Sequence, residues 1–202
     1  MSTVFSPEAE RLDKRWQDNK NSQHRRRILG IVTSLWRPEM KILDVGCGSG
    51  LFYEQLPDHV KPAHTGVDYT TEFIEMCQKK YPEGNFRQAD ALDLPFEDGS
   101  FDIVVNTSLL QHIPEWQRAL SEICRVASKY VITTTRIHLK KTEKSPVVKI
   151  WSWRFNLADM LREQKKYGRA SWWWTVGTDG NERMTAIFLL QKSLTNASPL
   201  PR

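Results

Sequence analysis

The chain has 202 residues, of which 40% are hydrophobic and 26% are charged, with ten glycines and ten prolines. These proportions exclude disordered, collagen-like and low-complexity proteins and predict one globular domain with its own core. No stretch of the sequence approaches the roughly 18 apolar residues that a membrane-spanning helix needs. Acidic residues stand near the start, where a signal peptide has its apolar run, so we expect a cytoplasmic protein. Cys47, Cys77 and Cys124 are far apart in the sequence, which predicts reduced thiols and no metal site.

The net charge of +5 is unevenly distributed along the chain. Residues 1–135 carry 16 Lys and Arg against 19 Asp and Glu, a net charge of −3. Residues 136–202 carry 13 against 5, a net charge of +8. This asymmetry favours an anionic partner for the C-terminal third, either an acidic small molecule, a nucleic acid or a lipid headgroup. Solvated surface cations explain it equally well, so charge alone does not identify a partner.

Between residues 40 and 135, short apolar runs alternate with amphipathic segments. The predicted strands are 40–45, 63–68, 85–90, 101–106 and 129–135, and the predicted helices are 49–56, 71–81 and 114–127. Strands that alternate with helices across short connections predict an α/β fold with a mostly parallel central sheet.

The flanking segments complete this prediction. Residues 7–36 carry an apolar stripe typical of a helical region, and the end of the chain contains two strand patterns joined by the turn-prone sequence GTDGNE. We therefore expect a Rossmann-like sheet of seven strands, flanked by helices, whose last strand is antiparallel. The expected parts of this single domain are an N-terminal helical cover (1–36), a binding core (40–135), a variable basic lid or loop (136–155), a closing helix and hairpin (156–192) and a frayed tail (193–202).

A glycine-rich turn follows the first predicted strand. That strand ends at Asp44 and Val45, and Gly46-Cys47-Gly48-Ser49-Gly50 follows. Glycines allow positive φ and a close approach of the backbone to a ligand. The dinucleotide fingerprint GxGxxG needs a third glycine where this chain has Leu51, which disfavours a nicotinamide oxidoreductase. An acid beside the turn repels a pyrophosphate but attracts an amino group or a sulfonium.

On these residues the chain resembles the class I S-adenosylmethionine (SAM)-dependent methyltransferases, specifically their small type-11-like members, from about Ile42 to Thr135. The phrase ILDVGCGSG is similar to the first motif of the family, GVDYT to the end of its second strand, and QADALDLPF to its adenine site. LPFEDGSFDIVV and NTSLLQHIPE are similar to the segments around the fourth strand. The resemblance implies SAM as cofactor, S-adenosylhomocysteine (SAH) as product, and a cofactor site made of Asp44, Gly46, Cys47, Gly48, Gly50, Asp68, Tyr69, Asp90, Ala91, Asn106 and Thr107.

The resemblance also assigns roles within this site. Asp68 is expected to accept both ribose hydroxyls, for which the two oxygens of a carboxylate are suited. Tyr69 is expected to lie against the adenine, which Asp90 and Ala91 clamp, with Asp93 as an alternative to Asp90. Each acid also admits a structural role, as a turn cap or a surface acid.

The acceptor side is less defined by the sequence. His112 is the candidate general base. Members of the family often have two histidines here, and this chain has Gln111 in the first place; a structural role of His112 is the alternative. Trp16 is a candidate cover, and Arg136 and His138 are candidate contacts to an acidic acceptor. The run Trp172–Trp174 is either core packing or an aromatic wall of the substrate pocket.

We therefore expect methyl transfer to oxygen or nitrogen of a small or medium-sized acceptor, either acidic or glycan-like. The alternatives are an RNA or protein methyltransferase with the same cofactor site, and a non-catalytic Rossmann-like protein that binds SAM or SAH. Nucleic acid is not favoured, because no basic run interleaved with aromatics resembles a known RNA-binding module. The sequence does not indicate the oligomeric state.

Overall fold

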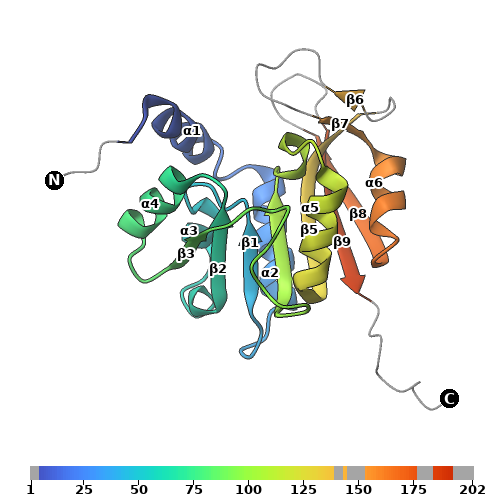
Figure 1. The fold of residues 1–202 in the computed structure, drawn as a ribbon, viewed down its shortest axis with the longest axis horizontal. Coiled ribbons are helices and arrows are strands. Elements are labelled where there is room, and N and C mark those ends of the chain that lie inside the picture. Colours follow the sequence, from blue (N-terminus) through green and yellow to red (C-terminus); the bar gives the residue numbers. More distant parts are fainter. Residues whose placement is uncertain (1–4, 139–142, 145–152, 177–183, 193–202) are drawn as a thin grey trace.

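The computed structural model describes residues 5–138, 143–144, 153–176 and 184–192. They form one sheet with helices on both of its faces (Figure 1). The strands are β1 (Ile42–Val45), β2 (His64–Asp68), β3 (Asn85–Gln88), β4 (Phe101–Thr107), β5 (Ala127–His138), β6 (Glu143–Lys144), β7 (Trp153–Asn156), β8 (Gly168–Val176) and β9 (Met184–Lys192). The helices are α1 (Pro7–Asp18), α2 (Gln23–Leu35), α3 (Leu51–Gln55), α4 (Thr71–Lys80), α5 (Trp116–Val126) and α6 (Leu157–Gln164), with 3-10 turns η1 (Lys61–Ala63) and η2 (Leu110–His112).

The pairing of the strands confirms the predicted fold class. β1 pairs in parallel with β2 and β4, β2 with β3, and β4 with β5. β9 is antiparallel to both β5 and β8. The seven strands in the order β3-β2-β1-β4-β5-β9-β8 match the mostly parallel sheet expected from the sequence, whose last strand in the chain, β9, is antiparallel; β7 and β6 extend the sheet to nine strands. Because parallel strands share one direction, the carboxyl ends of β1, β2, β4 and β5 lie at the same edge of the sheet.

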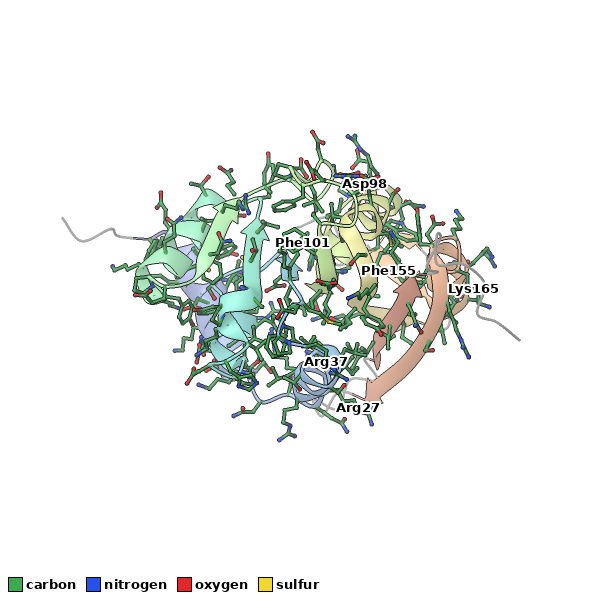
Figure 2. The ribbon with its side chains drawn as sticks, turned by 90° about the horizontal axis from the view of Figure 1, so that it is seen from below. Arg27, Arg37, Asp98, Phe101, Phe155 and Lys165 are labelled. Carbon is green, nitrogen blue, oxygen red and sulfur yellow. The ribbon has the colours of Figure 1, made fainter. Side chains whose placement is uncertain are left out.

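The two faces of the sheet are covered by different helices. Ile28 and Val32 of α2 pack with Ile42 and Ile103 on one face, and Leu120 of α5 belongs to the larger cluster on the other. Figure 2 shows Arg27 and Arg37, from α2 and the residues after it, on the opposite side of the sheet from Asp98. All four residues of β1 are buried, as expected for a central strand covered on both faces.

The segment 136–155 differs from the predicted loop. β5 continues to His138, and Ile137 and His138 pair in parallel with Phe155 and Asn156 of β7, which also pairs with β6. The loop prediction is therefore wrong for the described ends of this segment. The physical reason is core packing, because the Phe155 side chain is fully buried and its ring centroid lies 5.0 Å from that of Trp116. Lys140 and Lys141 lie outside the described residues.

The N-terminal helical region is divided into two helices. α1 ends at Asp18 and α2 begins at Gln23, so the expected helical stretch over 7–36 is interrupted at residues 19–22. The break lets α1 leave the face that α2 covers and lie beside α4 (Figure 1). In the described part of the chain, no helix has the length and apolar character that crossing a bilayer requires.

The closing helix and hairpin follow the prediction. Asn156 caps α6, since its side chain accepts a hydrogen bond from the Ala158 N–H at 2.8 Å. β8 and β9 pair along their whole length. Trp172–Trp174 lie on β8, but their side chains, and the tail 193–202, lie outside what the structure describes.

Candidate functional site

The glycine turn between β1 and α3 is fastened to the end of β2. The N–H groups of Gly46 and Cys47 both donate to the carbonyl of Val67, at 2.8 and 3.0 Å. Gly46 and Gly48 have φ of 76° and 53°, in the left-handed region that other residues enter only at a cost. The turn therefore needs its glycines for its shape.

Two side chains from distant segments close over this turn. A Cβ built on Gly46 would lie 2.8 Å from Cδ1 of Leu109, which follows β4. A Cβ built on Gly48 would lie 2.7 Å from Cζ3 of Trp16, on α1. The predicted cover residue Trp16 thus lies against the predicted cofactor turn. Leu109 and Trp16 occupy the space that a side chain at Gly46 or Gly48 would need.

Polar contacts anchor α1 in this position. Asp13 accepts a hydrogen bond from the Ser49 hydroxyl, within the turn itself, and forms an ion pair with Lys80 of α4 at 2.6 Å. Gln17 donates to Glu54 of α3 at 3.0 Å. The Trp16 ring centroid lies 5.1 Å from that of Phe73 on α4. α1 is therefore docked on the rim of the site through both charge and packing.

Asp68 lies at the carboxyl end of β2, beside the turn. Its Oδ2 accepts the N–H of Gly48 at 3.0 Å and its Oδ1 accepts the N–H of Thr70 at 2.9 Å. Burial raises the pKa of Asp68 above its usual 3.8, although these two N–H groups oppose the shift. Each oxygen keeps a second lone pair for a ligand hydroxyl. The neighbouring Tyr69 is 71% exposed, an aromatic surface open to a ring ligand.

Asp44 is buried beneath the turn with an unused acceptor. It is 1% exposed, and no described residue donates to its Oδ1. Nε2 of the buried His64 lies 3.8 Å from Oδ2, which is beyond hydrogen-bond distance. An unpaired buried carboxylate oxygen is costly, so Asp44 is an acceptor in need of a cationic or N–H donor.

The third strand ends near the expected adenine clamp. Asp90 is exposed, and its Oδ1 accepts the N–H of Leu92 at 2.9 Å, which caps its own turn. The N–H of Asp93 donates to the carbonyl of Asp90 at 3.1 Å. Ala91 is buried. The alternative between Asp90 and Asp93 as the adenine partner thus stays open.

Asn106 and Thr107 end β4. The buried amide Nδ2 of Asn106 donates to Thr133 on β5 at 2.9 Å, while its Oδ1 has no donor among the described residues. Ser108 follows with a φ of 55°, and its N–H donates to the carbonyl of Thr134 at 2.9 Å. This left-handed turn returns the chain over the glycine turn and places Leu109 there.

Gln111 contacts two of the residues expected at the acceptor site, His112 and Arg136. It is 4% exposed, and its Oε1 accepts the Thr135 hydroxyl at 2.9 Å and the Arg136 N–H at 3.4 Å. Its Nε2 lies 3.3 Å from Nε2 of the exposed His112. Because Oε1 is occupied as an acceptor, the amide nitrogen is the atom that meets His112, whose Nε2 then accepts. The side chain of the third candidate, His138, lies outside the described residues.

The first turn of α2, which the sequence analysis did not single out, carries charges that interact with Asp44 and Arg136. Burial, followed by the positive charges of Arg25 and Arg136, lowers the pKa of His24 to about 4. Burial also lowers the pKa of Arg25, while the Asp44 carboxylate raises it. The sequence signal was the run His24-Arg25-Arg26-Arg27 at the start of a helix, where cations oppose the helix dipole.

The three cysteines are buried, free thiols. A hydrogen bond with Cys77 and burial raise the pKa of the Cys47 thiol, and Cys77 donates to the carbonyl of Gly48 at 3.1 Å. Burial raises the pKa of Cys124 to about 12. A thiol that stays protonated is a poor nucleophile. Within the described residues, no cluster of His, Cys, Asp and Glu could hold a metal ion.

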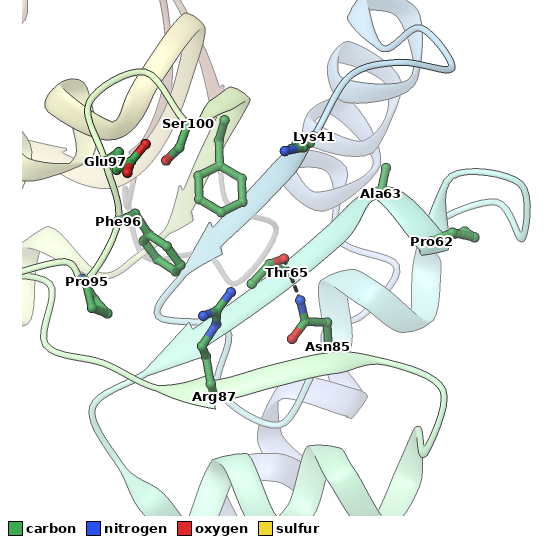
Figure 3. Close-up of a pocket in the computed structure, with 11 residues that line it drawn as sticks. Lys41, Pro62, Ala63, Thr65, Asn85, Arg87, Pro95, Phe96, Glu97 and Ser100 are labelled. Carbon is green, nitrogen blue, oxygen red and sulfur yellow. Dashed lines mark hydrogen bonds between the residues drawn. The ribbon is translucent and has the colours of Figure 1, made fainter.

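One cavity among the described residues lies away from this site. It has a volume of about 510 Å³ and is lined by residues at the amino ends of the strands, such as Lys41, Ala63 and Phe101 (Figure 3). Arg87 lies over the Phe96 ring at 4.7 Å there. Since ligands of open α/β sheets bind at the carboxyl ends of the strands, this cavity is not the cofactor site.

Comparisons with known proteins relate this chain to methyltransferases. Residues 43–131 match a family model described as a methyltransferase domain. A phthiotriol/phenolphthiotriol dimycocerosates methyltransferase of Mycobacterium leprae is 30% identical over 150 residues, which cover 73% of this chain and 53% of that protein. A fatty-acid O-methyltransferase of Mycolicibacterium smegmatis is 36% identical over 89 residues, which cover 43% of this chain and 32% of that protein. The chain thus spans about half, or less, of the length of these relatives.

A solved structure shares the fold. Magnesium protoporphyrin IX methyltransferase from Synechocystis, determined with bound SAH, superposes with a TM-score of 0.63 at 15% identity, covering 86% of this chain and 84% of that one. At this identity the likeness concerns the fold alone.

Proposed function

We propose that this chain, whose residues 43–131 form a methyltransferase domain of the class I SAM-dependent kind, methylates a carboxylate oxygen of a small acidic acceptor such as a fatty acid. The arrangement of Asp44, the glycine turn and Asp68 at one sheet edge is the observation that carries the methyl-transfer part of this proposal. The nature of the acceptor rests on the groups around Gln111, on the positive charge of the C-terminal third and on the relatives.

The residues at the sheet edge fit SAM. Asp44 has a buried oxygen without a donor, which suits the ammonium group of the methionine part. Gly46 and Gly48 let Leu109 and Trp16 approach the turn closely, and Asp68 keeps free lone pairs for two hydroxyls. When bound, SAM supplies a methyl group on a sulfonium; an acceptor lone pair forms the new bond to carbon, while the electrons of the broken S–C bond stay on sulfur, giving SAH.

The chain's own residues orient the reactants and exclude water. Asp44 fixes the methionine part of the cofactor and Asp68 its ribose, and Trp16 and Leu109 cover the turn from two segments distant in the sequence. Holding two reactants in line converts a bimolecular step into an effectively unimolecular one, which contributes about 7–11 kcal/mol in well-oriented cases. Positioning of this kind is sufficient for an acceptor that is already a nucleophile.

The contact between Gln111 and His112 favours an acceptor that has already lost its proton. The amide nitrogen of Gln111 contacts Nε2 of His112. This contact occupies the lone pair on Nε2 that His112 would need to act as a general base. A carboxylate has already lost its proton at neutral pH and needs no such base, whereas a hydroxyl does. The named activity of the M. smegmatis relative, O-methylation of a fatty acid, involves an acceptor of this kind.

The test is product formation with a matched panel. The purified chain is incubated with SAM and dodecanoate, dodecanol, glucuronate or RNA, and SAH is quantified. The proposal predicts SAH and methyl dodecanoate with dodecanoate, and little product with dodecanol. Product from RNA alone would support the nucleic-acid alternative. SAM binding without turnover on any acceptor, including cell extract, would contradict the proposal in favour of a non-catalytic binding protein.

A further inference from the structure

A buried histidine faces Asp44 from the neighbouring strand. His64 begins β2 and is in register with Ile42, while Asp44 is in register with Gly66. Residues two apart on a strand lie on the same face of the sheet, so His64 and Asp44 are diagonal neighbours on one face. Their side chains are 0% and 1% exposed, and Nε2 of the ring lies 3.8 Å from Oδ2 of the carboxylate.

Gly66 makes room for this arrangement. It lies opposite Asp44, and a Cβ built on it would lie 3.1 Å from Cε1 of the His64 ring and 2.6 Å from Cδ1 of Phe86. Gly66 is not among the glycines with a positive φ, so this position needs a glycine for space and not for its backbone angle. The imidazole therefore lies over Gly66, in the direction of Asp44.

The other neighbours of the imidazole are aromatic. The ring centroids of Phe52, Tyr53 and Phe86 lie 6.1, 5.2 and 5.7 Å from that of His64. Neither ring nitrogen of His64 has a hydrogen-bond partner among the described residues, and a buried polar group without a partner is costly. A phenylalanine would fill these aromatic surroundings without that cost. The histidine therefore indicates a use for a ring nitrogen, and Asp44 is the carboxylate that this nitrogen faces.

We propose that His64 is a positioning residue of the cofactor site, which holds the Asp44 carboxylate in the orientation that receives the ammonium group of SAM. This inference rests on the proposed function, in which Asp44 binds that group. A carboxylate only accepts hydrogen bonds, so Nε2 of His64 carries the proton that faces it. Polar contacts in a site are often long before a ligand binds and tighten in the complex, so we expect this contact to shorten when SAM is bound.

The benefit of this contact depends on the ligand. An Asp44 side chain that is already held in place loses little conformational freedom when it binds an ammonium group, and such preorganisation increases affinity. A ligand that lacks the ammonium group makes no use of Asp44, so its affinity does not depend on His64. A role of His64 in packing alone affects both kinds of ligand equally.

Calorimetric titrations use SAH and deamino-SAH, in which hydrogen replaces the α-amino group. We expect His64→Phe to weaken SAH binding about three- to tenfold and to leave deamino-SAH binding unchanged. His64→Gln should bind SAH more tightly than His64→Phe does, because an amide N–H can replace the N–H of the ring. Phe86→Leu is the matched control, since it alters the packing of the same aromatic cluster and removes no polar group.

A double-mutant cycle tests whether His64 acts through Asp44. Asp44→Asn is expected to weaken SAH binding by itself. In that background, His64→Phe should cause no further loss of SAH affinity, because the carboxylate that it positions is gone.

Four results overturn the inference while the wild-type chain still binds SAH. They are wild-type SAH affinity of His64→Phe, an equal loss for SAH and deamino-SAH, an undiminished effect of His64→Phe in the Asp44→Asn background, and an equal loss of SAH affinity in Phe86→Leu. If His64→Phe does not fold, the nitrogen NMR signals of the His64 ring in the wild-type chain decide. A shift of the Nε2 signal with SAH alone is expected, and the same response to both ligands overturns the inference. Failure of the wild-type chain to bind SAH contradicts the proposed function itself.

Discussion

The indole of Trp16 lies against Gly48, so that a Cβ added to this glycine would come within 2.7 Å of Cζ3 of the ring. The two residues are far apart in the sequence, and their contact brings α1 onto the glycine turn. This contact explains why the turn needs a glycine for space as well as for its backbone angle.

Gly48→Ala is therefore expected to be more damaging than the same change at Gly99. Both glycines have a left-handed φ, of 53° and 64°, which costs a residue with a Cβ about 1–2 kcal/mol. Only at Gly48 does the methyl group also collide, since the nearest atom at Gly99 is 3.7 Å away. Thermal unfolding and SAH titration of both variants measure the difference.

The double variant Trp16→Ala/Gly48→Ala separates the two costs. Removing the indole relieves the collision but not the backbone strain. We therefore expect Gly48→Ala to lower the unfolding free energy less in the Trp16→Ala background than in the wild-type chain. Strictly additive effects of the two substitutions would show that the collision is absent.

Asp68→Asn tests the ribose contact. The substitution removes the negative charge that strengthens hydrogen bonds from hydroxyls. Such hydrogen bonds contribute about 1.5–3 kcal/mol, so we expect SAH to bind about ten- to a hundredfold more weakly. Asp58→Asn is the control, because Asp58 is exposed and pairs only with Lys61 among the described cations. Equal affinities of the two variants would refute the role of Asp68.

The affinity for SAH is also expected to fall in acid. Burial raises the pKa of Asp68 above 3.8, so its carboxylate takes up a proton at a higher pH than a free aspartate does. The protonated group is the weaker acceptor. Titrations from pH 7 downward should therefore show an affinity loss that begins above pH 3.8 and is absent in Asp68→Asn.

His24 makes the stability of the folded chain depend on pH. Its pKa is about 4 in the folded protein and 6.5 when exposed, so between these values the unfolded chain binds a proton that the folded chain does not. Stability is then highest above pH 6.5 and falls as the pH drops toward 4, by something on the order of 2 kcal/mol. The unfolding free energy from urea titrations should vary less with pH across this range for His24→Gln than for the wild-type chain, and an equal pH dependence of the two would contradict the assignment.

Gln111→Leu tests the junction between η2 and β5. The change leaves the buried Thr135 hydroxyl and the Arg136 N–H without the acceptor that they share, at a cost of about 1–3 kcal/mol for a buried unpaired group. We expect a lower unfolding free energy and a lower kcat with the cofactor affinity kept, because the glycine turn is not touched. A loss of SAH affinity equal to that of Asp68→Asn would contradict this assignment.

The residues that we propose to bind the cofactor could be predicted from the sequence because their signals are local. The run from Ile42 to Val45 is a buried strand, and the glycines that follow it make a turn whatever lies around them. The closing hairpin is predicted for the same reason, since alternating strands and a turn sequence are next to one another.

The acceptor half depends on contacts between distant segments. Phe155 joins β7 to the core through Trp116, and no local period marks that packing. The charge of Asp44 acts on Arg25 only because α2 runs back along the sheet, and the spacing of these two residues in the sequence does not show this. The break between α1 and α2 likewise follows from the docking of α1 on α4, through Asp13 and Lys80.

The most direct measurement is calorimetric titration of the wild-type chain and Asp68→Asn with SAM, SAH and NAD. The account predicts micromolar binding of SAM and SAH, about ten- to a hundredfold weaker binding of both to Asp68→Asn, and no binding of NAD. Binding of NAD together with failure to bind SAM would contradict the assignment of the glycine turn and of everything built on it.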